Sequence, residues 1–306
     1  MKEYAVVFGA TSFIGMNLVK KLIELDYEVL AVYRPDSANF ERLYSEVKDN
    51  TKYLQVDICN ERTYSVLKQI ERCDYLFLVS WAGSNKKDLQ DSINQKSAVG
   101  LLKCLQQILN RIPCKKVIMF GTQAEYGLLK GTVSEKSECK PVSIYGREKL
   151  NFYNQASQYC KEKRIPFLEY RIHSIYGPLR GGMIGNLVAE LNNANKKIIM
   201  QSNCEQKWDF VYIDDLIRAL ILGIKMNLET GCYNISSGKI SSLKEYIELA
   251  KQEINPEANL VYGRQKDKTA PDFIFDSSKF RLATKWVPEV TFRQGIRKMQ
   301  EACLKR

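Results

Sequence analysis

The chain has 306 residues, 45% of them hydrophobic, and a formal net charge of +11, so it is long enough for one large domain or two joined ones. No apolar run approaches the roughly 20 residues of a membrane helix, and the start MKEYAVVF lacks the regions of a signal peptide. We therefore expect a cytoplasmic protein without a membrane partner. The basic residues are spread along the chain, which favours a solvated surface over nucleic-acid binding. Nine cysteines without a C-x-x-C pair and a single histidine, His173, argue against a disulfide framework, a zinc site and a Ser-His-Asp hydrolase.

A strand, a tight turn and a helix are predicted at the start of the chain. The run YAVVF is apolar, and apolar residues recur at helical spacing from about Met16. Glycines in such a turn let the backbone approach a pyrophosphate, whose charge the helix N-terminus holds. Gly9 and Gly15 are present, with Ser12 between them. The turn predicts a dinucleotide site, unless it is a plain connection between strand and helix.

Strand-like and helix-like segments then alternate. The strand-like runs are YAVVF, YEVLAVY, KYLQVDI, DYLFLVS, KVIMFGT and PFLEYRIHSIYG. The clearest helices are SAVGLLKCLQQIL and the segment after Tyr145. This alternation predicts an α/β fold with a doubly wound parallel sheet, whose ligands lie beyond the carboxyl ends of the strands.

The pattern changes after YGPLRGGMIGN. A helix near residues 186–194, the strand-like KKIIM, the run WDFVYIDDLIRALILGI, the strand-like CYNIS and a final helix from about Thr291 follow. We expect a smaller second α/β domain, interleaved with strands that return to the first.

One tyrosine and one lysine stand at a spacing that suits proton transfer. Tyr145 and Lys149 are four residues apart in a predicted helix, so they share one face. A nearby ammonium favours the phenolate form of a tyrosine, whose ordinary pKa is about 10, which makes Tyr145 a candidate general acid and base. Thr122 follows the strand KVIMF, where its hydroxyl could bind a substrate oxygen.

With these residues in order, the sequence resembles the extended short-chain dehydrogenase/reductase family, the NAD(P)-dependent epimerases, dehydratases and reductases of nucleotide sugars. The resemblance covers nearly the whole chain. Its segments are FGATSFIG, VDI, LVSWAG, Asn94 in NQKSAVGLL, GTQAEYG, YGREK, RIHSIYGP, WDFVYIDDL, CYNISSG and DSSKFRLATKWVP. It implies that residues 1–177 form a Rossmann domain that binds NAD(P), completed by strands from about 208–236. Residues 178–306 would then form mainly the substrate-binding domain.

The resemblance also implies roles for single residues. Thr122, Tyr145 and Lys149 would be catalytic. The implied cofactor-binding residues are Gly9, Thr11, Ser12, Phe13, Ile14, Gly15, Arg34, Asp57, Ile58, Ser80, Trp81, Ala82, Tyr145, Lys149 and His173. The implied substrate-binding residues are Gln123, Asn186, Lys207 and Arg264. His173 could equally be a core histidine, and no metal is expected.

The end of the second strand bears on the cofactor. An acidic residue there would bind the ribose hydroxyls of NAD, whereas an arginine accommodates the extra phosphate of NADP. Tyr33 fills the place of the acid and Arg34 follows it, with Asp36 two residues on. We expect NADP(H), and Asp36 keeps NAD(H) open.

The residues after Thr122 narrow the reaction. Dehydratases of the family carry an Asp-Glu pair there, and this chain has Gln123 and Ala124. The combined epimerase-reductases use a cysteine and a histidine where Ala124 and Leu179 stand. Reduction of a 4-keto-deoxy nucleotide sugar and 4-epimerisation with bound NAD remain, and Arg34 favours the reductase.

Two further expectations come from the resemblance. A non-catalytic NADP-binding regulatory protein on the same fold is a second alternative, against which the intact Thr122, Tyr145 and Lys149 argue. The partner would be a nucleotide-diphosphate sugar, in the context of polysaccharide biosynthesis. The chain would form a homodimer through segments 94–110 and 145–163.

Overall fold

The computed structural model describes residues 2–47, 51–82, 92–178, 182–193, 197–268 and 270–304. The chain divides into two compact units. The first unit comprises Met1–Gly127, Cys139–Arg171 and Leu220–Tyr233, and the second comprises Leu128–Glu138, Ile172–Ala219 and Asn234–Arg306. The roles expected for the two parts, cofactor and substrate binding, stay predictions. Leu179 lies outside the described residues.

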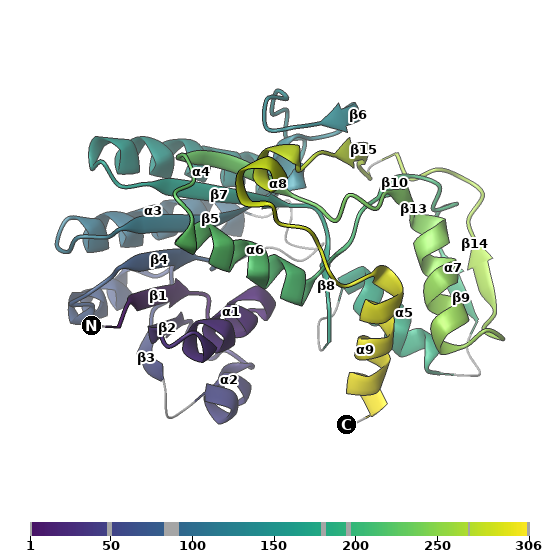
Figure 1. Ribbon diagram of the computed structural model, residues 1–306, viewed down its shortest axis with the longest axis horizontal. Coiled ribbons are helices and arrows are strands. Elements are labelled where there is room, and N and C mark those ends of the chain that lie inside the picture. The colour runs from purple at the N-terminus through teal and green to yellow at the C-terminus, as the bar shows by residue number, and fades with distance from the viewer. Residues whose placement is uncertain are drawn as a thin grey trace. The chain divides into compact units, whose positions relative to one another are not determined.

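A central sheet organises the first unit. Its strands are β1 (Tyr4–Phe8), β2 (Glu28–Tyr33), β3 (Thr51–Gln55), β4 (Tyr75–Leu78), β5 (Lys116–Thr122), β7 (Phe167–Ile172) and β12 (Gly231–Ile235). Within the described ranges these seven strands follow the order β12-β7-β5-β4-β1-β2-β3, and the pairs from β3 through β2, β1 and β4 to β5 are parallel (Figure 1). The strand order reverses at β1, which is where doubly wound sheets bind ligands. The predicted α/β fold with a doubly wound parallel sheet is confirmed.

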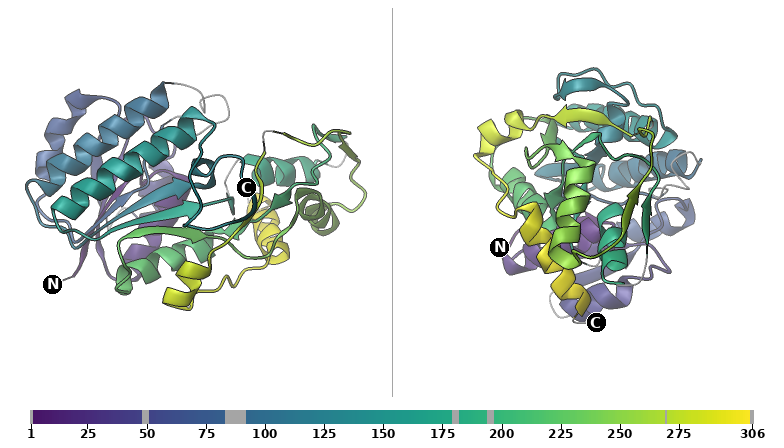
Figure 2. Two further views of the ribbon diagram at one scale, coloured as in Figure 1. Left: turned by 90° about the horizontal axis from the view of Figure 1, so that it is seen from above. Right: turned by 90° about the vertical axis from the view of Figure 1, so that its right-hand side faces the viewer.

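Helices cover both faces of this sheet. The helical segments of the first unit are α1 (Phe13–Glu24), α2 (Phe40–Val47), η2 (Glu61–Gln69), α3 (Ile93–Leu109), η3 (Gln123–Glu125) and α4 (Ile144–Glu162). Figure 2 shows α3 and α4 on one face and α1 on the other. The strands β1, β4 and β5 are buried along their whole length, as expected for strands covered on both sides. The first helix begins at Phe13, three residues before the predicted start, because Ser12 caps it.

The second unit is built from short strands and four complete helices, counted over the described residues. Its strands are β6 (Lys130–Val133), β8 (Ile175–Tyr176), β9 (Ile198–Met200), β10 (Lys207–Trp208), β11 (Val211–Tyr212), β13 (Ser241–Ser242), β14 (Leu260–Tyr262) and β15 (Asp272–Phe275). Its helices are α5 (Gly182–Leu191), α7 (Leu243–Ile254), α8 (Ser278–Thr284) and α9 (Phe292–Leu304), and α6 (Ile213–Lys225) runs from the second unit into the first. The helices α5, α7 and α9 pack against one another.

Of the strands expected from about 208–236 to complete the central sheet, only β12 joins it. The strand β10 pairs with β13 and β11 pairs with β8, and each pair forms a separate two-stranded sheet within the described residues. The helix expected near residues 186–194 begins earlier, at Gly182.

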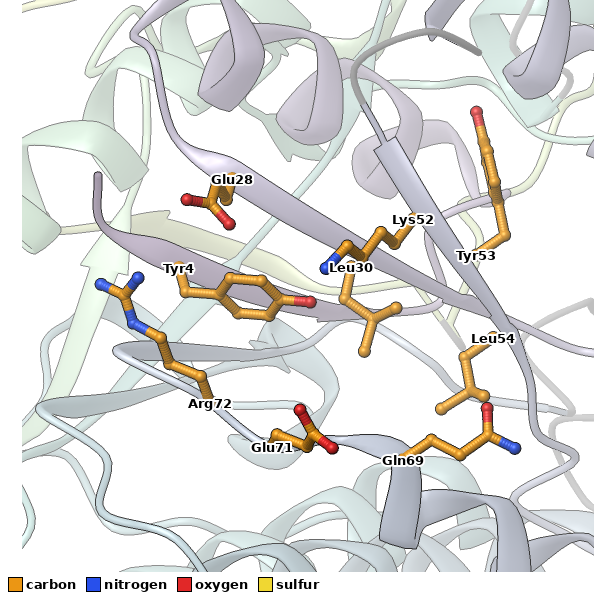
Figure 3. A pocket seen from close by; sticks show the side chains of 9 residues that line it. All are labelled: Tyr4, Glu28, Leu30, Lys52, Tyr53, Leu54, Gln69, Glu71 and Arg72. Atoms are coloured by element: carbon orange, nitrogen blue, oxygen red, sulfur yellow. The ribbon is translucent and has the colours of Figure 1, made fainter. Parts of the chain in front are cut away.

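No helix in the described part of the chain is long and apolar enough to cross a membrane. A pocket of the first unit lies at the start of β1 and β2. Figure 3 shows Tyr4 and Glu28, the first residues of these strands, beside Lys52 and Arg72. Because ligands of doubly wound sheets bind at the carboxyl ends, this pocket is separate from the candidate site.

Candidate active site

The turn between β1 and α1 is held in a tight form by its glycines. Gly9 has a φ of +79°, and a Cβ atom there would lie 2.7 Å from the backbone nitrogen of Ser80. A Cβ on Gly15 would lie 2.1 Å from the carbonyl oxygen of Gly9. Ser12 has a φ of −74°, which any residue adopts, and its hydroxyl accepts a hydrogen bond from the Gly15 N–H at 3.0 Å. The turn therefore does not need a glycine at residue 12.

The loop after β2 is tied to this turn. The Ser37 hydroxyl donates a hydrogen bond to the buried Thr11 hydroxyl at 2.8 Å, and the Asn39 amide donates to the Thr11 carbonyl at 3.3 Å. The Tyr33 ring stacks on Phe40 with centroids 4.3 Å apart. The exposed Arg34 lies at the start of this loop, and Phe13 and Ile14 begin α1.

Further predicted residues follow β3 and β4 in the first unit. Asp57 is half-buried and its carboxylate accepts the Cys59 N–H at 2.9 Å. Ile58 is buried, and its carbonyl accepts the Tyr64 hydroxyl at 2.6 Å. Ser80, Trp81 and Ala82 follow β4 directly, and the Ala82 N–H bonds to Ser97.

The segment after β5 lies against the N-terminus of α4. Thr122 ends β5 and caps η3, its hydroxyl accepting the Ala124 N–H at 3.2 Å. A Cβ atom on Gly146 would lie 2.4 Å from the Ala124 carbonyl oxygen. Glycine at 146 thus permits the close approach that brings the half-buried Tyr145 to the η3 segment, which also carries Gln123.

Lys149 is a buried cation with few partners. Its side chain is 4% exposed, its Nζ donates a hydrogen bond to the Phe120 carbonyl at 2.8 Å, and Nζ lies 4.0 Å from the centroid of the Trp81 ring. Burial lowers the pKa of Lys149 to about 8, and nearby carboxylate charge, chiefly that of Glu125, opposes this effect.

The Trp81 side chain is fixed beside the Lys149 ammonium by a hydrogen bond and an aromatic contact. Its indole N–H donates to the Asn94 side chain at 2.9 Å, and its ring meets Tyr145 edge to face with centroids 6.4 Å apart. A cation over an indole face is stabilised by the ring electrons. Trp81, a predicted cofactor-binding residue, therefore contacts both Tyr145 and Lys149, two of the predicted catalytic residues.

The other predicted residues lie in the second unit. His173 is enclosed by aromatic rings, with Trp208 4.9 Å and Phe275 5.8 Å away between centroids, and burial lowers its pKa to about 4. The remaining three are exposed and lie on different elements: Asn186 on α5, Lys207 on β10 and Arg264 after β14. Their binding roles stay predictions.

Comparison with known proteins assigns the chain to a family. A sequence model of the NAD dependent epimerase/dehydratase family matches residues 5–236. The chain belongs to this family. The membership predicted from the motifs is confirmed, and so is the expectation of an enzyme.

The relatives of this chain within the epimerase/dehydratase family are named for different reactions. A putative UDP-glucose 4-epimerase of Methanocaldococcus jannaschii is 22% identical over 306 residues, covering 96% of each chain. A dTDP-4-dehydro-6-deoxyglucose reductase of Escherichia coli is 22% identical, covering 97% of this chain and 96% of the relative. The solved UDP-glucose 4-epimerase of Thermotoga maritima, determined with UDP-glucose, has a TM-score of 0.86 and 21% identity over 99% of both chains. The structural likeness shows the shared fold.

The sequence motifs of the epimerase/dehydratase family did not reveal a buried charge cluster beside Thr122. Glu125, Glu169 and Arg171 are fully or almost fully buried. Two signals were available: Glu125 stands three residues after Thr122, in the pattern of a capping box, and the apolar strand FLEYRI carries two charged residues on one face.

Proposed function

We propose that this chain reduces the keto group of a 4-keto-deoxy nucleotide sugar with a nicotinamide cofactor, Tyr145 serving as the proton donor. The buried Lys149 ammonium, one helical turn after Tyr145 and packed on Trp81, is the observation that carries the proposal. A buried ammonium needs a reason, because burial penalises its charge, and tuning the neighbouring phenol supplies one. Similarity to a dTDP-4-dehydro-6-deoxyglucose reductase over most of both chains supports the reaction class.

The turn after β1 fits a dinucleotide. Gly9 and Gly15 keep the turn tight, Ser12 leaves its backbone unstrained, and the first turn of α1 contains no acidic residue. The positive end of the helix dipole is thus not neutralised by the chain itself, which suits a pyrophosphate. When bound, the cofactor would supply the hydride for reduction.

Residues of the chain itself would carry out the proton transfer to the substrate oxygen. Lys149 would hold positive charge beside the phenol, which eases the loss of the Tyr145 proton to the substrate oxygen. Thr122 would orient that oxygen through its hydroxyl. Gln123 and Ala124 cannot transfer protons, so a dehydration that needs a further acid and base is disfavoured.

We propose NADPH as the preferred cofactor because Tyr33 and Arg34 occupy the place where NAD enzymes carry an acid. Arg34→Ala is expected to raise the KM for NADPH about tenfold, since an arginine–phosphate contact is charge-assisted, and to leave the KM for NADH within about twofold. Initial rates with both cofactors check this. Arg42→Ala, in α2, is the control, and an equal loss for both cofactors would contradict the assignment.

The alternative is a nucleotide-sugar 4-epimerase that keeps NAD bound. Similarity to a putative UDP-glucose 4-epimerase over 96% of this chain favours it, and Thr122, Tyr145 and Lys149 would serve both reactions. Titration of the purified protein with NADPH and NADH, followed by nicotinamide fluorescence, separates the two. A preference for added NADPH, no copurified cofactor and turnover of a 4-keto-6-deoxy nucleotide sugar would support the reductase. Copurified NAD and no preference for NADPH would support the epimerase.

A further inference from the structure

Three charged side chains lie buried together beneath the candidate catalytic residues, all within the first unit. The side chains of Glu125 and Glu169 are 0% exposed and that of Arg171 is 4% exposed. Arg171 Nε lies 2.8 Å from one oxygen of Glu125 and 3.0 Å from one oxygen of Glu169. The cluster lies directly under β5, since a Cβ atom on Gly121 would meet both carboxylates, at 2.6 and 2.7 Å.

The two carboxyl groups have different hydrogen-bond environments. One oxygen of Glu125 accepts the Thr122 N–H at 2.7 Å and the other accepts the Arg171 Nε–H at 2.8 Å. In the described part of the chain, neither oxygen of Glu169 has a well-aligned hydrogen-bond donor; the Arg171 Nε atom lies 3.0 Å from one of them, and the Cys232 thiol is its other close polar neighbour. Donors that point at a carboxylate favour its ionised form, and burial without them favours the neutral acid. The negative charge therefore belongs on Glu125 and the proton on Glu169.

Several titratable or charged groups face this cluster from the elements around it. They are Glu125 and Tyr126 at η3, Cys139 in the loop after β6, Lys149 and Tyr153 from α4, Glu169 and Arg171 from β7, and Cys232 from β12. Burial raises the pKa of the Tyr126, Tyr153 and Cys232 side chains, so these stay neutral near pH 7. Lys149 and Arg171 are the cations of this group. With Glu125 as its one carboxylate, the group carries a net charge of +1.

We propose that Glu125 is a positioning residue of this enzyme: one oxygen fixes the backbone of Thr122, and its negative charge keeps the buried Lys149 ammonium protonated, while Glu169 carries a proton. The catalytic consequence rests on the proposed function, because only there does Lys149 act on Tyr145. The effect of the Glu125 charge on the protonation of Lys149 does not depend on the proposed function. In support, burial raises the pKa of both carboxyl groups, but Arg171 and the Thr122 N–H oppose this effect at Glu125, whereas the pKa of Glu169 lies well above its ordinary value and the charge of Glu125 adds to this rise.

The test is a titration of Lys149 in the full chain by NMR of ¹³Cε-labelled lysine, with its signal identified by loss in Lys149→Met. In the unaltered protein the midpoint is expected near pH 8. Glu125→Gln keeps an acceptor for Thr122 but removes the charge, so the midpoint should fall by about one pH unit. Glu169→Gln resembles the protonated acid and should move it by less than about 0.3 unit. Glu162→Gln, at the exposed end of α4, is the control for charge removal.

A third variant separates charge from position. Glu125→Asp retains the charge but is too short to reach Thr122, so the Lys149 midpoint should stay while kcat falls with little change in cofactor KM. If Glu125→Gln does not fold, an unchanged Lys149 midpoint together with a lower kcat in Glu125→Asp is still the expected result, and an unchanged kcat in this variant contradicts the positioning role. A midpoint that moves in Glu169→Gln and not in Glu125→Gln, or in neither, overturns the proposal. Because the NMR readout needs no turnover, a failure of the proposed reaction is seen separately, as an intact Lys149 shift without reduction of any 4-keto sugar.

Discussion

Tyr145→Phe is expected to lower kcat for reduction roughly 10³-fold while cofactor affinity stays within about twofold, because a positioned proton donor contributes about 10²–10⁴ in rate. The phenyl ring keeps the edge-to-face contact with Trp81, so the site should retain its shape. Turnover with a 4-keto-6-deoxy nucleotide sugar and fluorescence titration with NADPH measure the two quantities.

A matched control lies on the same helix. Tyr159 is half-buried in α4 and its hydroxyl donates to Asn110 at 2.9 Å, away from the charge cluster. Tyr159→Phe should leave kcat within about twofold, since no proton passes through it. If Tyr145→Phe also retained its turnover, the proton-transfer mechanism would be wrong.

Arg171→Met is expected to destabilise the protein by roughly 3–5 kcal/mol at pH 7.5, because it leaves the buried Glu125 carboxylate without the guanidinium that contacts it. The loss should be smaller at pH 5. Without Arg171 the folded state favours the protonated form of Glu125 as well as that of Glu169, so the folded variant binds more protons than the unfolded chain, and its stability falls as pH rises. Urea unfolding at both pH values measures the difference.

An exposed pair provides the comparison. Arg42 and Glu46 form an i,i+4 ion pair on α2 with side chains about one third exposed, and Arg42→Met should cost no more than about 0.5 kcal/mol, with little pH dependence. A loss below about 1 kcal/mol in Arg171→Met would show that the buried cluster does not require its cation.

The catalytic and cofactor segments could be predicted because their signals are local. The Gly9–Gly15 turn, Thr122 at a strand end and the spacing of Tyr145 and Lys149 each lie within a few residues, and the alternation of strands and helices predicts the ends at which they meet. The element boundaries were less accurate where a cap decides them: the Ser12 hydroxyl starts α1 three residues before the apolar pattern does.

The strand pairing after residue 178 was not predictable in the same way. The run WDFVY resembles a strand of the central sheet, yet β10 (Lys207–Trp208) and β11 (Val211–Tyr212), which lie at its two ends, each make a two-residue pairing elsewhere. Which backbone groups pair depends on partners distant in the chain, and a strand pattern of this length does not specify them. The binding roles of Asn186, Lys207 and Arg264 stay predictions for a related reason, because a side chain on an exposed element carries no local signal of its ligand.

The sequence by itself determined the fold class, the family and the candidate proton-transfer residues, since turn glycines, helical spacing and strand-end hydroxyls are encoded by neighbours in the chain. Only the tertiary structure decided the electrostatics of Lys149. Glu125, Glu169 and Arg171 come from η3 and β7, and Trp81 follows β4. The order of the strands in the sheet makes these groups neighbours. Because the folded chain also excludes water around them, their charges interact more strongly than in solvent, and these interactions set their protonation states.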